Sequence, residues 1–163
     1  MKSKGFTLIE AVVVIAILAI LALFGVGSII EFQKNSLHLA EAEEFASILR
    51  DARTRSLTGQ LLPGEQASTF EPDGLPEYGV KVAGTNYILF RQFQLWGAPA
   101  PASGDLETYA ISDKLLLTPS PSEVIFDRVT GESSFVTFTL TRKDSGGIIE
   151  VEADAKGVSL KKL

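Results

Sequence analysis

The 163-residue chain has no cysteine and only one histidine, His38. The absence of cysteine excludes disulfides, thiolate nucleophiles and cysteine-ligated metal sites, although it leaves the cellular compartment open. No phosphate-binding loop, metal-spaced carboxylate motif or dinucleotide fingerprint is present. We therefore predict no catalytic residue, no metal site and no cofactor.

The chain also has fewer basic than acidic residues, with 15 Lys and Arg against 20 Asp and Glu and a formal net charge of −5. Such a chain gains no long-range attraction to nucleic acid. The basic residues form small groups, for which we predict solvated faces rather than a nucleic-acid site: Arg50, Arg53 and Arg55, then Lys156, Lys161 and Lys162.

The segment KDSGG, residues 143–147, is similar to the stretch around the nucleophile of chymotrypsin-like proteases. That chemistry requires a histidine within hydrogen-bond reach of the serine. His38 is expected on a helix far away in the sequence, as a solvated residue, so Ser145 has no base. We predict a glycine-rich turn here. Trp96, beside a Pro/Ala-rich loop, is interpreted as an aromatic at the edge of the core, with a partner anchor as the alternative.

The chain does have one long apolar run, because residues 11–30 carry no charge. Twenty helical residues span roughly 30 Å, the thickness of the hydrocarbon core of a bilayer. A removable signal peptide has a shorter apolar region followed by a cleavage site. The run therefore favours a membrane-spanning helix. Lys2 and Lys4 predict a cytoplasmic N-terminus, with the rest of the chain on the other side.

An acidic residue, Glu10, stands directly before this run. A carboxylate inside a membrane is costly and usually has a partner. The alternative is that Glu10 lies at the level of the lipid headgroups. The physical argument alone leaves both interpretations open.

The segment KGFTLIE, residues 4–10, followed by an apolar helix, resembles the N-terminal signal of type IV pilins and type II secretion pseudopilins. The resemblance implies that a prepilin peptidase/methyltransferase cuts between Gly5 and Phe6 and methylates the new amine of Phe6. It also implies that Glu10 pairs with the N-terminal amine of a neighbouring pilin in a filament, and that lipid surrounds the helix before assembly. Many members carry a proline where this chain has Gly25 and Gly27.

Beyond residue 30 the apolar pattern becomes that of an amphipathic helix. Phe45, Ile48, Leu49 and Ala52 fall on one helical face, and Gly59 is a suitable terminator. We predict one helix from about Phe6 to Thr58. The expected organisation is a leader at 1–5, a transmembrane and assembly helix at 6–30, a soluble half of the helix at 31–59 and a globular domain at 60–163.

The globular part alternates apolar and polar residues, which predicts strands. The expected strands are residues 78–83, 87–93, 109–112, 114–118, 123–127, 134–141, 148–153 and 157–162. Residues 97–105 are expected to form an exposed loop, and residues 154–157 a hairpin turn that places Lys161 across from an acidic strand face. The predicted fold class is α+β, with the long N-terminal helix packed on an antiparallel β-sheet.

Three further segments resemble the minor pseudopilin H group and its minor-pilin relatives: ILRDAR (48–53), VIFDRVTG (124–131) and IIEVEADAKGVSL (148–160). This resemblance implies a non-enzymatic minor pseudopilin of a type II secretion pseudopilus or pilus-like filament, anchored in the inner membrane and driving protein export. The alternatives are a major type IV pilin, which the lack of a C-terminal cysteine pair disfavours, a DNA-binding minor pilin of an uptake pilus, and a membrane-anchored hydrolase.

Overall fold

The structure is a computed structural model that describes residues 7–70, 74–95, 97–98 and 100–163, with the backbone alone for residues 23–27. The chain divides into two compact units, the first ending at Leu37 and the second running from His38 to Leu163. Each unit is described by itself below.

The helix α1 covers Leu8–Thr58 and passes through Gly25 and Gly27 without interruption. Its end has the hydrogen bonds of a Schellman motif. The N–H of Gly59 donates to the carbonyl of Ser56 over 3.0 Å, and the N–H of Gln60 donates to that of Arg55 over 3.1 Å. Gly59 has a φ of +56°, which glycine adopts without strain. The predicted terminator is confirmed, and the predicted start at Phe6 lies outside the described residues.

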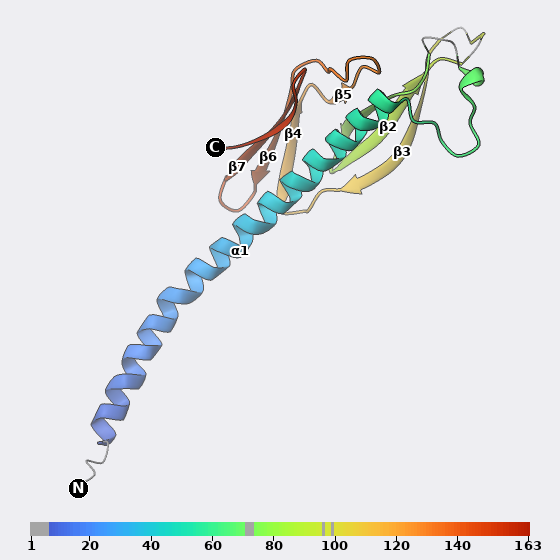
Figure 1. Cartoon of the computed structure of the whole chain (residues 1–163). Helices are drawn as coiled ribbons and strands as arrows, with labels where there is room; N and C mark the ends of the chain where they lie inside the picture. Colours follow the sequence, from blue (N-terminus) through green and yellow to red (C-terminus); the bar gives the residue numbers. More distant parts are fainter. Residues whose placement is uncertain (1–6, 71–73, 96, 99) are drawn as a thin grey trace. The chain divides into compact units, whose positions relative to one another are not determined.

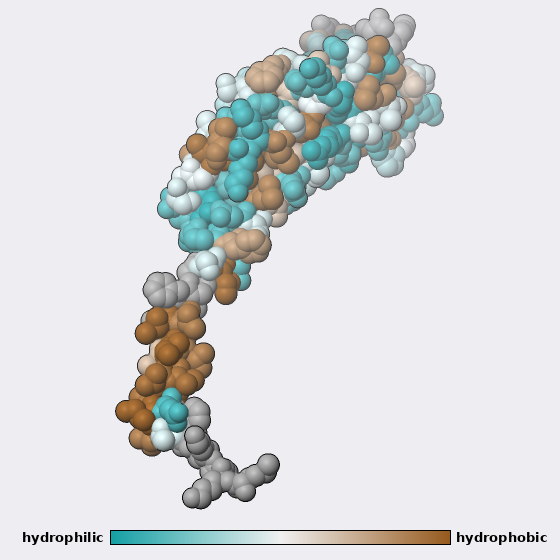
Figure 2. All heavy atoms as spheres, turned by 60° about the vertical axis from the view of Figure 1, so that its left-hand side comes forward, coloured by the Kyte–Doolittle hydropathy of each residue, from teal (hydrophilic) through white to brown (hydrophobic). Residues whose placement is uncertain are grey.

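Over residues 8–22 of the first unit, α1 exposes mainly apolar side chains, and Figure 2 shows this part of the helix covered by hydrophobic residues. A helix that is apolar all round has no polar face to turn toward water. None of the helices in the described part of the chain, however, is long and apolar enough to count as a membrane span.

The described residues of the second unit form eight strands in two antiparallel four-stranded sheets, which Figure 1 shows beside the last part of α1. The first sheet has the order β3-β2-β1-β5, with β1 at Glu77–Ala83, β2 at Asn86–Phe93, β3 at Ala102–Ala110 and β5 at Glu123–Ile125. The second has the order β4-β6-β7-β8, with β4 at Leu115–Ser120, β6 at Val136–Arg142, β7 at Ile148–Asp154 and β8 at Gly157–Lys162. A 3₁₀ turn, η1, covers Ala67–Thr69.

The α+β fold class and its antiparallel pairing are confirmed, whereas the sequence predicted a single sheet. The division into two sheets arises because strands that are distant in the sequence pair with each other. β5 returns to pair with β1, and β4 pairs with β6, so that β4 and β5 are neighbours in the chain but belong to different sheets. Strand periodicity does not encode such a choice of partner.

The expected loop at residues 97–105 is wrong in its second half, because β3 begins at Ala102. This strand forms an edge of the first sheet and pairs with β2 from Phe93 opposite Ala102 to Asn86 opposite Ala110. The predicted strand at 109–112 is correspondingly displaced, since β3 ends at Ala110. Small residues such as Ser103 and Gly104 pair through their backbones, and therefore give no apolar pattern.

Phe45 of α1 connects the helix to both sheets. Its ring lies 4.9 Å from that of Tyr87 in β2 and 4.9 Å from that of Phe138 in β6, both in edge-to-face geometry. The predicted apolar face of the helix is buried in the core, together with positions that the prediction did not include: Ala42, Ala46 and Ser56. The helix thus closes the core between the two sheets.

The hairpin between β7 and β8 follows the prediction. Asp154 pairs with Gly157, which has a φ of +143°, and the Asp154 carboxylate accepts the N–H groups of Lys156 and Gly157. Lys161 lies opposite Glu150 in β7, with 3.7 Å between its Nζ and a carboxylate oxygen. This cross-strand ion pair is confirmed.

Candidate functional site at the start of the helix

The predicted cleavage site, Gly5 and Phe6, lies outside the described residues, which begin at Thr7. Both residues therefore remain predictions. The described part of the candidate site is the first turn of α1, which contains Thr7 and Glu10.

Thr7 and Glu10 form a capping box at the helix start. The Glu10 carboxylate accepts the backbone N–H and the hydroxyl of Thr7, both over 2.9 Å, and the backbone N–H of Glu10 donates to the Thr7 hydroxyl oxygen over 3.3 Å. Reciprocal bonds of this kind satisfy two N–H groups that have no partner inside the helix. Glu10 also places a negative charge at the positive end of the helix dipole.

The capping box adds a role for Glu10 that the sequence interpretation missed. The signal was present as Thr-x-x-Glu directly before an apolar helix. Both bonds from Thr7 reach the same carboxylate oxygen, Oε2. Among the described residues, the other oxygen has no hydrogen-bond donor, so the box leaves capacity for a further cation or donor.

The prediction that His38 is solvated is wrong. Its side chain is only 5% exposed, and its Nε2 lies 3.2 Å from the carbonyl oxygen of Leu140 in β6. Because a carbonyl only accepts, Nε2 carries the proton and donates. Burial lowers the pKa of His38, the bond to Leu140 raises it, and the charge of Arg142 lowers it further. This helix position is thus buried against β6 rather than open to solvent.

The described residues bring together no catalytic or metal-binding group. Ser145 is exposed in the turn between β6 and β7, where Gly146 has a φ of +70° as a glycine-rich turn requires. His38 instead bonds to Leu140. In the described part of the chain, no three His, Asp or Glu side chains lie close enough to hold a metal ion.

Two of the helix arginines that were predicted to be solvated instead form ion pairs and hydrogen bonds with other parts of the chain. Arg55 Nη2 lies 2.8 Å from Asp51 and 3.7 Å from Glu107 in β3. Arg53 Nε donates to the carbonyl of Gly131 over 2.8 Å, and Arg53 Nη1 donates to that of Lys156 over 3.4 Å. These long side chains gain partners from strands and loops folded against α1.

Arg53 therefore joins three segments that are distant in the sequence. It belongs to residues 48–53, Gly131 ends residues 124–131, and Lys156 lies in the turn within residues 148–160. The loop that carries Gly131 is itself ordered by Asp127, whose carboxylate accepts the N–H groups of Val129 and Thr130. One guanidinium thus connects the three segments.

Comparison with known proteins gives a match at the N-terminus of the chain. Residues 1–26 match the family model of the prokaryotic N-terminal methylation motif. This match supports a type IV pilin-like or pseudopilin subunit, a group whose members are structural rather than enzymatic. It implies processing by a prepilin peptidase and assembly with other pilins. No curated protein and no solved structure gives a significant match to the chain.

Proposed function

We propose that the chain is a non-enzymatic minor pseudopilin of a type II secretion pseudopilus or a closely related pilus-like filament. The observation that carries this proposal is the methylation motif at residues 1–26, which continues into the apolar part of α1. The finer assignment rests on the resemblance of three segments to the minor pseudopilin H group: residues 48–53, 124–131 and 148–160.

In this proposal the leader, residues 1–5, is removed between Gly5 and Phe6, and the Phe6 amine is methylated. Residues 6–30 lie in the inner membrane before assembly and among sister helices afterwards, with the N-terminus cytoplasmic. The exposed apolar side chains of the first unit support this, because lipid or other apolar helices remove them from water. The second unit then lies outside the cytoplasm.

Glu10 has two roles in the proposed assembly. Within its own chain it caps the helix through Thr7, and in the filament it pairs with the N-terminal amine of a neighbour. A buried ammonium and a buried carboxylate offset each other's desolvation only when they are paired, so subunits stacked in register are favoured. Breaking such a pair costs about 3–5 kcal/mol.

Glu10→Gln and Glu10→Ala separate these two roles. Glutamine is suited to the capping position but carries no charge, whereas alanine removes both functions. In cells that contain a prepilin peptidase, we expect both variants to be cleaved, because the cut lies before Phe6. Both should lose crosslinking to neighbouring pilins, and Glu10→Asp should restore it only in part because its side chain is shorter.

Two measurements test the proposal in wild type and variants. Intact mass should show loss of residues 1–5 and gain of one methyl group, and retention of the leader in peptidase-competent cells would contradict the processing step. Crosslinking in membranes should fall equally in the glutamine and alanine variants. Wild-type crosslinking by Glu10→Gln would show that the helix cap, and not the charge, is what assembly requires.

A further inference from the structure

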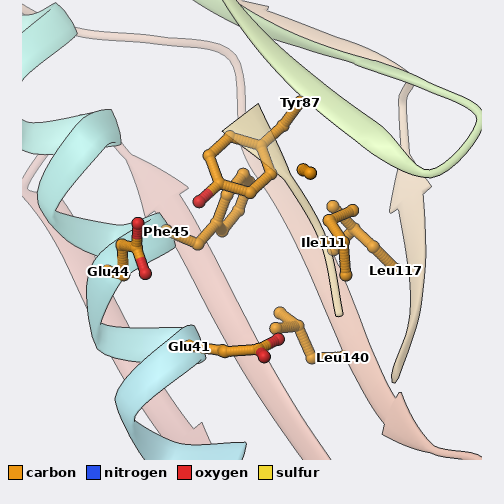
Figure 3. Close-up of a pocket in the computed structure, with 8 residues that line it drawn as sticks. Glu41, Glu44, Phe45, Tyr87, Ile111, Leu117 and Leu140 are labelled. Atoms are coloured by element: carbon orange, nitrogen blue, oxygen red, sulfur yellow. The ribbon is translucent and has the colours of Figure 1, made fainter. Parts of the chain in front are cut away.

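The second unit contains a small pocket between α1 and the strands (Figure 3). Its volume is about 70 Å³. A cavity needs a volume of about 10–15 Å³ to hold a single water molecule, so the pocket has room for a group of several heavy atoms. The lining residues come from α1, β2, the end of β3 and the residue after it, β4 and β6: Glu41, Glu44, Phe45, Tyr87, Ala110, Ile111, Leu117 and Leu140.

Two carboxylates of α1 lie at this pocket. Glu41 and Glu44 are three positions apart, which places them on neighbouring turns of one helix face. Among the described residues, neither carboxylate takes part in a hydrogen bond or an ion pair. Two negative charges therefore border the pocket without a positive partner in the described chain.

The hydroxyl of Tyr87 is a further polar group at the pocket. Tyr87 is only 5% exposed, and Figure 3 shows its hydroxyl turned toward the side on which Glu44 lies. Within the described residues this hydroxyl has no hydrogen-bond partner. Burial raises the pKa of Tyr87, and the charge of Glu44 raises it further, so the phenol remains neutral. Its oxygen keeps the capacity to accept a hydrogen bond.

The rest of the pocket is apolar. Ile111, Leu117 and Leu140 line it opposite the helix, and the rings of Phe45 and Tyr87 meet edge to face beside them. Aliphatic walls favour a hydrocarbon stem, and aromatic faces attract a cation. A hydrated metal ion would gain nothing from these walls, because hard cations take oxygen ligands.

We propose that the pocket binds a primary ammonium group carried on a short aliphatic stem. The ammonium has three donors and no acceptor, which suits a pocket bordered by carboxylates and a phenol oxygen, while its stem packs against the leucines. A lysine side chain of a neighbouring protein and a free alkylamine share this chemistry. The inference does not depend on the filament function, because it rests on the second unit alone.

Titration of the full chain, in a nonionic detergent, with n-butylammonium chloride tests the proposal. We expect saturable NMR shift changes at Tyr87, Ile111, Leu117 and Leu140. Butanol, which lacks the charge, and potassium chloride, which lacks the stem, should not produce them. No saturable change at these residues, or the same change with butanol, would overturn the proposal.

Variants identify the groups that bind. Glu41→Gln combined with Glu44→Gln should weaken butylammonium binding about tenfold or more, and Tyr87→Phe about threefold, because charge-assisted hydrogen bonds contribute more than neutral ones. Ala110→Leu narrows the pocket from an exposed position while keeping both carboxylates, and should also abolish binding. The control is Glu43→Gln, an exposed carboxylate of the same helix that does not line the pocket. Unchanged affinity in both the double variant and Ala110→Leu would contradict the assignment.

Carbodiimide treatment of membranes that contain the full chain distinguishes a bound lysine side chain of a neighbouring protein from a bound free alkylamine. The reagent joins a carboxylate to an amine within contact distance as an amide, with loss of one water. A lysine-containing peptide attached at Glu41 or Glu44 identifies a protein partner, and a small added mass identifies a free amine. If amine adducts form at these residues no more often than at Glu43, the proposal fails.

Discussion

At the scale of single residues, His38 shows how a side chain near the start of the second unit is tied to the core. It donates from Nε2 to the carbonyl of Leu140, across a sequence separation of 102 residues. The charged groups that act on it come from three elements: Glu41 on α1, Arg142 at the end of β6 and Lys162 on β8. Burial has the largest effect on its pKa, which lies below the ordinary value of 6.5.

This lowered pKa predicts a loss of stability in acid. In the pH range between the folded pKa and 6.5, the unfolded chain binds more protons than the folded one, so stability rises with pH there. The contribution of His38 is fully present above pH 6.5 and is lost as the pH falls through the folded pKa. Because the chain has one histidine, its ring NMR signals report this pKa directly.

The test compares those ring signals in the folded full chain and in urea. We expect a lower midpoint in the folded state. His38→Gln, which retains a donor but does not titrate, should remove the corresponding acid-dependent loss of stability. Equal midpoints in the folded and unfolded chains would show that burial does not control this group.

At the scale of elements, the first sheet depends on a close approach between β1 and β5. Gly79 in β1 lies opposite Ile125, and a Cβ added at Gly79 would overlap the carbonyl oxygen of Val124 and come within 3.0 Å of the Phe90 ring. The strand pair thus requires a residue without a side chain at this position.

Gly79→Ala is therefore expected to destabilise the protein by about 1–3 kcal/mol, the usual cost of overpacking a core. Gly104→Ala is the matched control, because Gly104 lies in a strand of the same sheet and a Cβ there meets no atom within 4 Å. The control should be neutral or slightly stabilising. Denaturant midpoints of the two variants provide the comparison, and equal midpoints would refute the packing argument.

At the scale of the whole molecule, the two units differ in whether their apolar side chains are exposed or buried. The first unit exposes them along its helix, whereas the second buries them around Phe45 between the two sheets. A unit with its own closed core does not depend on lipid for its fold.

We therefore expect a fragment comprising residues 31–163 to fold in water, with a cooperative thermal transition. Phe45→Ala in this fragment should cost about 3–5 kcal/mol, as for other buried phenylalanines. Phe135→Ala, at a side chain that is 64% exposed, is the control and should change stability by less than about 0.5 kcal/mol. A fragment without a cooperative transition by circular dichroism would contradict this division of the chain.

The sequence by itself determined the features that depend on neighbouring residues. The end of α1 at Gly59, the apolar face that includes Phe45 and Leu49, the hairpin at Asp154 and the Thr7–Glu10 pattern can all be found in the printed sequence. Helical and strand periodicity, capping and turn chemistry each act over only a few residues, and so leave a local signal.

Only the tertiary structure decided which distant groups meet. The separation into two sheets, the use of residues 102–105 as an edge strand, the burial of His38 and the convergence on Arg53 all depend on contacts between remote segments. The pocket at Tyr87 likewise combines one helix with strands from both sheets. Which residues are buried and which strands pair depends on backbone pairing and core packing across the whole fold. A short stretch of sequence therefore does not reveal either one.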